Sequence, residues 1–396
     1  MFGQQNFNTN SAVIKVMGVG GGGCNAVNSM IDSNVSSAQF ISVNTDNQAL
    51  LLSRAEICLQ IGEKITKGLG AGSDPSIGEQ AAEESKDAIV ELLQGTDLLF
   101  IAAGMGGGTG TGAAPVIAKI AREMNILTVA VVTKPFSFEG RVRNENANKG
   151  IANLKKYVDT VVIIPNDKLL QFLPAHIGML QAFKVADDML KQGVVGIVDL
   201  IATPSLINLD FADVKTVIQK QGLAHMGIGR AKGENRVIEA VRQAVSSPLL
   251  ETTIEGAKSI IINVTGGPDI ELNEIYDAST LVQGIIDESA NIIFGATIDE
   301  NMADEIKITI IATGFLPYNE TEEKKEDTIS PVISLFEEKK QAERDSQTVE
   351  SNTQVVEPIP VVEEKLEEVE VVEEVQVQEE KKELPAFMKR LFGKIN

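Results

Sequence analysis

Residues 102–115 combine residue types that suit phosphate binding. They read Ala-Ala-Gly-Met-Gly-Gly-Gly-Thr-Gly-Thr-Gly-Ala-Ala-Pro, directly after the strand-like run 97–101 and directly before a helical pattern over 113–124. Glycines let the backbone adopt positive φ and approach a ligand closely, and N–H groups at a helix N-terminus point at anions. Two threonines add hydroxyl donors. We therefore predict a phosphate-binding loop here rather than a flexible connector.

A second glycine run, residues 18–23, follows the strand-like residues 13–18 and fits the dinucleotide fingerprint G-x-G-x-x-G. A Rossmann oxidoreductase is therefore one interpretation. Two glycine loops suit a nucleoside triphosphate better, because a dinucleotide fold needs only one. The Gly-Lys-Ser/Thr ending of a P-loop is absent from the chain, which argues against a P-loop NTPase.

Phe183 and Asp187 lie four residues apart in the long apolar pattern over 178–201, so a helix would place both on one face. Guanine presents N1–H and N2–H₂ together, and a carboxylate accepts both, whereas adenine cannot present that pair. A carboxylate in an apolar helix also needs a partner. We predict that Asp187 selects guanine and that Phe183 stacks on the base, with a core position as the alternative for Phe183.

Residues 208–213 read Asn-Leu-Asp-Phe-Ala-Asp and open a helical pattern over 211–221. Asp210 then suits an N-cap and Asp213 the first turn, where the helix dipole favours acids. Two carboxylates near a triphosphate could instead orient and deprotonate a water molecule. The residues alone leave both interpretations open.

The run Gly-Gly-Gly-Thr-Gly-Thr-Gly at 106–112 resembles the signature of the tubulin and FtsZ superfamily, and residues 13–316 with the final residues resemble its FtsZ family. The resemblance implies a GTPase that uses GTP and Mg²⁺, has no metal site of its own, and assembles head to tail into filaments at the division ring. It implies that the acids of 208–213 serve the nucleotide of the neighbouring subunit. A nucleotide-binding scaffold without turnover and a Rossmann oxidoreductase are the alternatives.

Residue by residue, the resemblance implies catalytic roles for Asn208, Asp210 and Asp213. Glu139 and Arg143 resemble the family's ribose-contacting pair, although a Glu and an Arg four apart more often form a helix-surface pair. The nucleotide contacts implied are Gly21, Gly22, Gly23, Cys24, Asn25, Asn44, Ala71, Gly72, Gly104, Met105, Gly106, Gly107, Gly108, Thr109, Gly110, Glu139, Arg143, Asn166, Phe183 and Asp187.

The loop at 68–75 resembles the part of the family that senses the terminal phosphate. Asp74 stands where the resemblance would place Asn. A turn followed by an N-cap accounts for Ser73 and Asp74 equally well. Both interpretations are open for this loop.

The net charge of −21 is concentrated in residues 320–383, which hold 21 acidic and 8 basic residues. This charge argues against a general nucleic-acid binder. Two cysteines are too few for a disulfide framework or a cysteine-rich zinc site, and we expect free thiols. The sequence lacks a signal or transit peptide and an apolar run of about 18 residues, so we expect a cytoplasmic protein. The resemblance adds the mid-cell division site, on the inner face of the membrane.

Apolar strand patterns at 13–18, 97–101, 127–133 and 159–164 alternate with helical ones, among them 76–93. This alternation predicts an α/β fold, with a Rossmann-like parallel sheet covered by helices on both faces and ligands at the strands' carboxyl ends. Residues 384–396 place apolar anchors after an acidic tether, which is typical of a partner-docking peptide. The resemblance implies membrane tethers and division regulators as its partners, with indirect membrane contact. The predicted organisation is a disordered N-terminus (1–11), a GTP-binding domain (12–177), a central helix (178–201), a smaller second α/β domain with the catalytic loop (202–317), a disordered acidic linker (318–383) and the docking tail (384–396).

Overall fold

The computed structural model describes residues 12–315, with gaps at 34, 36, 171–175, 203–205, 208, 248–253, 288, 301 and 303. The predictions for 1–11, for 318–383 and for 384–396 lie outside the described residues. So does the prediction for Asn208.

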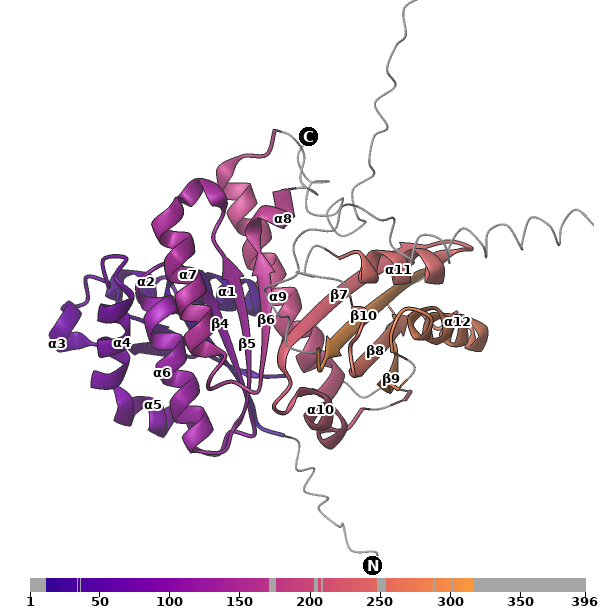
Figure 1. Ribbon diagram of the computed structural model, residues 1–396, viewed down its shortest axis with the longest axis horizontal. Helices are drawn as coiled ribbons and strands as arrows, with labels where there is room; N and C mark the ends of the chain where they lie inside the picture. Colours follow the sequence, from indigo (N-terminus) through magenta and orange to yellow (C-terminus); the bar gives the residue numbers. More distant parts are fainter. Residues whose placement is uncertain are drawn as a thin grey trace, which may run out of the picture. The chain divides into compact units, whose positions relative to one another are not determined.

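Within the described residues, ten strands form one sheet (Figure 1). Five pairings along its first six strands are parallel, so the carboxyl ends of these strands share one edge. The order is β3 (Ile57–Gln60), β2 (Gln39–Asn44), β1 (Ile14–Val19), β4 (Leu98–Gly104), β5 (Leu127–Lys134), β6 (Thr160–Pro165), β7 (Gly222–Lys232), β10 (Glu305–Thr313), β8 (Ser259–Gly266) and β9 (Asn291–Ile298).

The second part of the sheet joins the first through a short parallel pairing of β6 with β7, from Thr160 opposite Gly222 to Val162 opposite Ala224. Strand β10 then pairs antiparallel with both β7 and β8, and β9 pairs parallel with β8. The α/β class and the mostly parallel sheet are confirmed.

Helices cover both faces of the sheet, and within the described ranges none is long and apolar enough to cross a membrane. They are α1 (Gly20–Asp32), α2 (Asn47–Leu51), α3 (Glu63–Thr66), α4 (Pro75–Glu84), α5 (Lys86–Leu93), α6 (Thr109–Glu123), the 3₁₀ turn η1 (Ser137–Glu139), α7 (Arg141–Leu154), α8 (Asn166–Leu170), α9 (Met179–Ala202), α10 (Phe211–Ile218), α11 (Arg236–Val245) and α12 (Leu272–Gln283).

Two helix boundaries differ from expectation. The glycine run at 20–23 is the first turn of α1 rather than a loop before it. The expected helix over 76–93 divides at Ser85, which ends α4 and begins α5 with φ −100° and ψ 18°. The Ser85 hydroxyl accepts the N–H of Gly62 at 3.1 Å, so a tertiary contact holds this break.

Alternate residues of the central strands pack on opposite faces. On β4, Leu98 and Phe100 join the core under α1 and α9, whereas Leu99 and Ile101 join the core under α4, α5 and α6. Strands buried on both faces read as continuous apolar runs, and this explains the pattern seen in the sequence. The long helix α9 is thereby fixed against the sheet.

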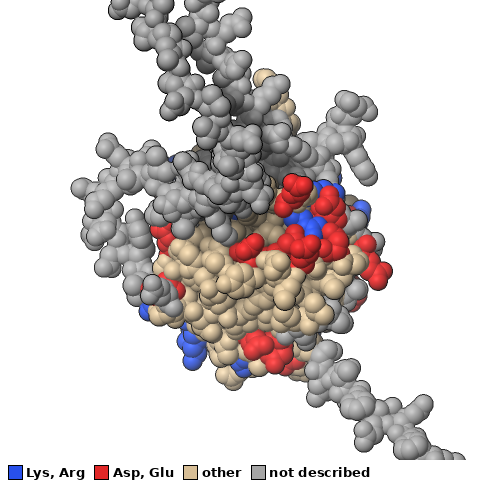
Figure 2. Space-filling view, turned by 90° about the vertical axis from the view of Figure 1, so that its right-hand side faces the viewer, with Lys and Arg blue, Asp and Glu red and all other residues tan. Residues whose placement is uncertain are grey.

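Charged side chains are unevenly placed on the side of the molecule that carries α11 and α12. Figure 2 shows this side: uncharged side chains cover most of its centre, and acidic side chains gather around a small basic patch at its upper right.

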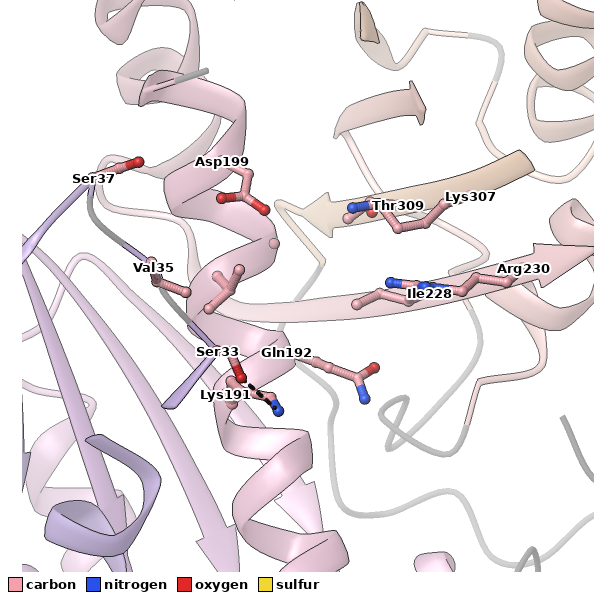
Figure 3. Close-up of a pocket in the computed structure, with 12 residues that line it drawn as sticks. Ser33, Val35, Ser37, Lys191, Gln192, Asp199, Ile228, Arg230, Lys307 and Thr309 are labelled. Carbon is pink, nitrogen blue, oxygen red and sulfur yellow. Dashed lines mark hydrogen bonds between the residues drawn. The ribbon is translucent and has the colours of Figure 1, made fainter. Parts of the chain in front are cut away.

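A cavity of about 330 Å³ lies between α9 and strands β7 and β10 (Figure 3). Asp199 of α9 and Lys307 of β10 enter it from opposite walls. Burial raises the pKa of Asp199 and lowers that of Lys307, because both charges lose water. This cavity is separate from the glycine loops described below.

Candidate functional site

The loop between β4 and α6 is held in one conformation. Gly106 donates its N–H to the Thr111 hydroxyl at 2.8 Å, and Met105 donates its N–H to the Thr133 carbonyl at 3.0 Å. Gly106 has φ of 105°, and a Cβ there would lie 2.8 Å from the carbonyl oxygen of Arg143. Thr111 is buried and holds the loop, so of the two threonines it is Thr109 that lines the cavity.

The two glycine segments pack directly on each other. A Cβ on Gly20 would lie 2.8 Å from the backbone nitrogen of Gly110, and one on Gly22 would lie 3.4 Å from Gly104. A Cβ on Gly21 would meet no atom within 4 Å. Glycine is therefore required where the backbones meet, and Gly21 leaves open space toward the cavity.

These segments line a cavity of about 460 Å³ at the carboxyl ends of the parallel strands. This volume lies within the usual range of ligand pockets. The predicted residues that line it are Gly21, Gly22, Asn25, Gly104, Met105, Gly107, Gly108, Thr109, Gly110, Glu139, Arg143, Asn166, Phe183 and Asp187.

Other predicted contacts lie behind this lining. Cys24 is buried, and burial raises the pKa of its thiol to about 11, so the thiol is neutral. Asn44 accepts the N–H of Thr45 at 2.9 Å and thereby holds the turn after β2. Gly23, Ala71, Gly72 and Gly106 also stand outside the lining.

Five lining residues were not predicted as contacts: Ser73, Thr133, Pro135, Ala186 and Leu190. Thr133 and Pro135 lie at the end of β5, where a strand's carboxyl end could have indicated them. Ala186 and Leu190 flank Asp187 on α9, and no signal in the sequence separates them from core residues.

One end of the cavity suits a planar base. The Phe183 ring meets the Phe136 ring edge-on, with centroids 5.5 Å apart, and the exposed Phe138 stacks on Phe136 at 5.1 Å. Burial, and then the neighbouring charge of Asp188, raise the pKa of Asp187 to about 7. A carboxylate beside aromatic rings can accept paired N–H donors from a base placed between them.

Polar side chains on the other walls of the cavity are positioned to bind a ligand. Glu139 accepts the N–H of Phe136 at 2.9 Å and pairs with Arg143 at 2.9 Å. Asn166 is buried, and its Oδ1 has no hydrogen-bond partner among the described residues. An unpartnered buried oxygen that lines a cavity marks a place where a bound donor would be stabilised.

The loop before α4 takes the turn conformation. Ser73 has φ of 64°, and Asp74 caps α4 by accepting the N–H of Ser76 at 2.8 Å. The hydrogen bond from the Ser76 hydroxyl, and then this one from its N–H, lower the pKa of the exposed Asp74 carboxyl. Gly108 packs here as well, since a Cβ on it would lie 2.8 Å from the Cβ of Ala71.

Asp210 and Asp213 lie away from this cavity. Asp210 accepts the N–H of Asp213 at 2.7 Å and caps α10, while Asp213 accepts the N–H of Asp210 at 3.3 Å. Along α9, Phe183 and Ala202 are about 28 Å apart at the rise of an α-helix. Figure 1 shows α8, which begins at the cavity with Asn166, and α10 at opposite ends of α9.

Family models match most of the described chain. Residues 13–174 match the GTPase domain of the tubulin/FtsZ family, and residues 222–316 match the C-terminal domain of the FtsZ family.

Comparison with solved structures supports the same family assignment. An empty FtsZ dimer of M. jannaschii shares 42% identity at a TM-score of 0.76, covering 81% of this chain and 96% of that one. A point mutant of M. jannaschii FtsZ shares 45% identity at a TM-score of 0.74, covering 77% and 92%. A GTPγS-bound protofilament of CetZ2 from Haloferax volcanii shares the fold, at 20% identity and a TM-score of 0.66 over 85% and 100%.

The cavity combines glycine backbones and a helix start that suit phosphates with an aromatic and carboxylate end that suits a base, as a nucleotide site requires. The GTPase-domain model, residues 13–174, covers both glycine segments together with Glu139, Arg143 and Asn166. The chain belongs to the FtsZ family of tubulin-like GTPases.

Proposed function

We propose that this protein binds GTP in the cavity of the glycine segments and hydrolyses it only within a head-to-tail filament. In this proposal the residues that line the cavity bind the nucleotide, and Asp210 and Asp213 of the next subunit act on its terminal phosphate. The filament would build the division ring. We propose the domain organisation of the sequence analysis with it, from 12–177 for GTP binding to 202–317 for the catalytic loop.

The nucleotide would lie along the cavity. The backbone N–H groups from Gly107 to Gly110 would face the phosphates, because the start of α6 favours negative charge. Asp187 would accept N1–H and N2–H₂ of guanine, with Phe183 beside the ring. Arg143, paired with Glu139, would lie near the ribose and phosphates and add positive charge.

Mg²⁺ would enter with the triphosphate, since it prefers phosphate oxygens and water to an all-protein cage. Among the described residues, no group of three His, Cys, Asp or Glu could hold a metal ion. Bound Mg²⁺ would neutralise phosphate charge.

The observation that carries the proposal is the distance between the cavity and the acids. Asp210 is exposed and Asp213 partly exposed, at the far end of α9 from the base site. Acids placed there cannot reach a phosphate in the same molecule. They could reach one in a second copy stacked on that end, where the two carboxylates would orient and deprotonate the attacking water.

Exposed apolar residues near the cavity and near the acids support the stacking of one subunit on the next. Phe138 and Val142 are exposed beside the cavity, and Leu206 and Ile207 are exposed beside the acids. A contact between two different faces of identical subunits repeats without closing and builds a filament. The empty FtsZ dimer of M. jannaschii supports self-association at this level of similarity.

We extend the proposal to location and partners. The protein would work in the cytoplasm at the division site, with membrane tethers and division regulators docked on 384–396 and membrane contact only through them. This part rests on family membership and on the apolar residues Phe387, Leu391 and Ile395 of the tail.

The test measures the GTPase rate per molecule against protein concentration. We expect almost no activity at high dilution and a rise above a threshold. Asp213→Ala should bind GTP with unchanged affinity and lose about a hundredfold in rate, as expected for a removed general base. A rate per molecule that is constant down to high dilution would refute the shared site.

A further inference from the structure

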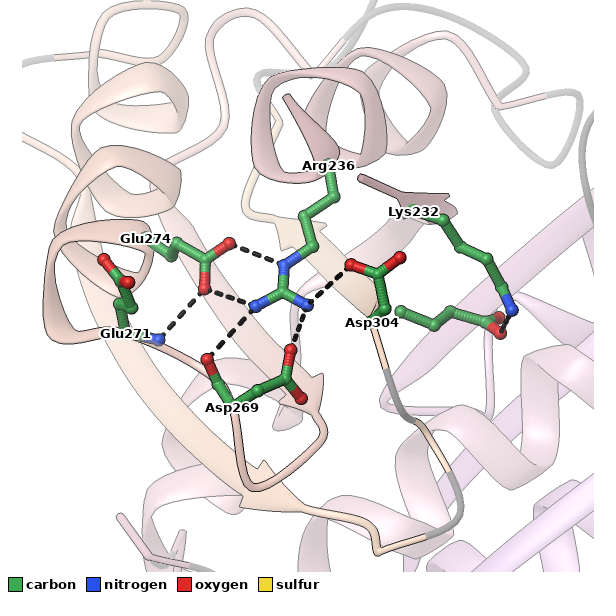
Figure 4. A network of polar contacts seen from close by, with 7 residues as sticks. Lys232, Arg236, Asp269, Glu271, Glu274 and Asp304 are labelled. Atoms are coloured by element: carbon green, nitrogen blue, oxygen red, sulfur yellow. Dashed lines mark hydrogen bonds and ion pairs between the residues drawn. The ribbon is translucent and has the colours of Figure 1, made fainter. Parts of the chain in front are cut away.

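Arg236 is the centre of a buried ion network at the start of α11 (Figure 4). Its Nε donates to Glu274 Oε1 at 2.6 Å, and its Nη2 donates to Glu274 Oε2 at 2.8 Å. Its Nη1 donates to Asp269 Oδ2 at 2.5 Å and lies 3.8 Å from Asp304. One guanidinium therefore joins α11, the loop after β8, α12 and the loop before β10.

The network is costly to break. The Arg236 side chain is only 7% exposed, whereas Asp269 and Asp304 reach solvent. Its hydrogen bonds lower the pKa of Glu274 and of Asp269, so both are charged at neutral pH. Removing one partner of such a pair leaves an uncompensated charge, while a paired arginine in fork geometry holds its partners in fixed orientation.

The network holds the first turn of α12. Glu274 Oε2 accepts the N–H of Glu271 at 2.9 Å as well as the Arg236 bond, so one carboxylate caps the helix and anchors it. This turn carries Leu272, 79% exposed, and the next turn carries Tyr276, 70% exposed. Arg236 therefore fixes the orientation of two large exposed apolar side chains.

Strand β9 connects the surface that carries these side chains to the catalytic loop. Leu272 and Tyr276 line a shallow pocket together with Phe294 of β9. Two residues further along β9, Ala296 exchanges backbone hydrogen bonds with Ile207 at 3.1 and 3.3 Å. Ile207 lies three residues before Asp210.

We propose that Arg236 is a positioning residue for assembly: it holds the first turns of α12 so that Leu272 and Tyr276 receive the nucleotide-bearing face of a second copy of this chain. The inference rests on the proposed function, because the acids of one subunit reach the nucleotide of the next only across this surface. The matching face of the second copy offers Phe138 and Val142. Arg236 itself is not among the residues that line the nucleotide cavity.

The experiment compares Arg236→Met with Glu239→Gln, a change at an exposed side chain of the same helix whose hydrogen-bond partner, Gln243, also lies on α11. The GTPase rate per molecule is measured over protein concentration, and GTP affinity is measured on dilute monomer. For Arg236→Met we expect the half-maximal protein concentration to rise about tenfold. The plateau rate and the GTP affinity should match those of the parent, and Glu239→Gln should match the parent throughout.

Glu274→Gln is the second variant, because Gln still caps a helix at this position while the charge that faces Arg236 is gone. It should raise the half-maximal concentration in the same direction by less, even if Arg236→Met fails to fold. The inference is overturned if both variants match Glu239→Gln, or if either lowers GTP affinity or the plateau rate without a shift in concentration. If the GTPase rate per molecule of the unchanged protein did not depend on protein concentration, the proposed function itself would be contradicted.

Discussion

The pKa of Asp187 predicts that the preference for guanine depends on pH. The carboxyl has to lose its proton before it can accept two N–H donors from the base. Burial and Asp188 raise its pKa in the nucleotide-free protein from 3.8 to about 7. A raised pKa means that the preference is present at pH values above about 7 and is lost as the pH falls through that value.

The magnitude follows from the ionised fraction. For a pKa of about 7, this fraction falls from about nine-tenths near pH 8 to about one-tenth near pH 6. Guanine preference should therefore fall about tenfold over that range, or about 1.4 kcal/mol. Asp188→Asn should move the midpoint lower, because the neighbouring charge is the second cause of the shift.

The assay measures the ratio of GTP to ATP affinity on dilute monomer from about pH 6 to about pH 8. The ratio is used because both triphosphates titrate near pH 6, with a second phosphate pKa of about 6, and this effect cancels. Asp187→Asn should give a smaller ratio that does not change with pH. A parent ratio that is flat over this range, or a sloping one in Asp187→Asn, would contradict the role of Asp187.

Three further predictions concern packing and the ends of the chain. Gly112→Ala should lower the free energy of unfolding, measured by chemical denaturation, by about 1–3 kcal/mol, because its Cβ would collide with the Pro75 carbonyl between α4 and α6; an unchanged value would contradict this close packing. Scrambling 320–383 at constant composition should leave the GTPase rate and light scattering with GTP unchanged, since a tether acts by reach and charge; loss of assembly would argue for a specific structure there. Deleting 384–396 should preserve both activities and abolish recruitment of filaments to tether-coated vesicles, and Phe387→Ala should weaken recruitment more than neutralising Lys389, Arg390 and Lys394; the reverse order would favour surface electrostatics.

The strands and the long helix could be predicted from the sequence because their patterns are local. Apolar runs predicted β1, β4, β5 and β6 to within a few residues, and the predicted 178–201 helix is Met179–Ala202. Residue types likewise predicted the cap by Asp74 and the capping acids of α10.

What could not be predicted depends on contacts between distant segments. The break at Ser85 is held by Gly62, and the cavity lining at Ala186 and Leu190 follows only once α9 lies against the glycine loops. Thr111 was expected to face the ligand but bonds Gly106, because the loop turns back on the start of α6. The network of Arg236 has no signature in the sequence, since its partners are 33 and 38 residues away.

Mixing two inactive variants tests the shared site most directly. Asp213→Ala would bind GTP but lack the catalytic acid, and Asp187→Ala would keep the acid but bind GTP poorly. If the acids act across the contact between subunits, the mixture should hydrolyse GTP well above the summed rates of its components, because one variant's nucleotide meets the other's Asp213. A mixture no faster than that sum, with both variants shown to co-assemble, would contradict a site shared between subunits.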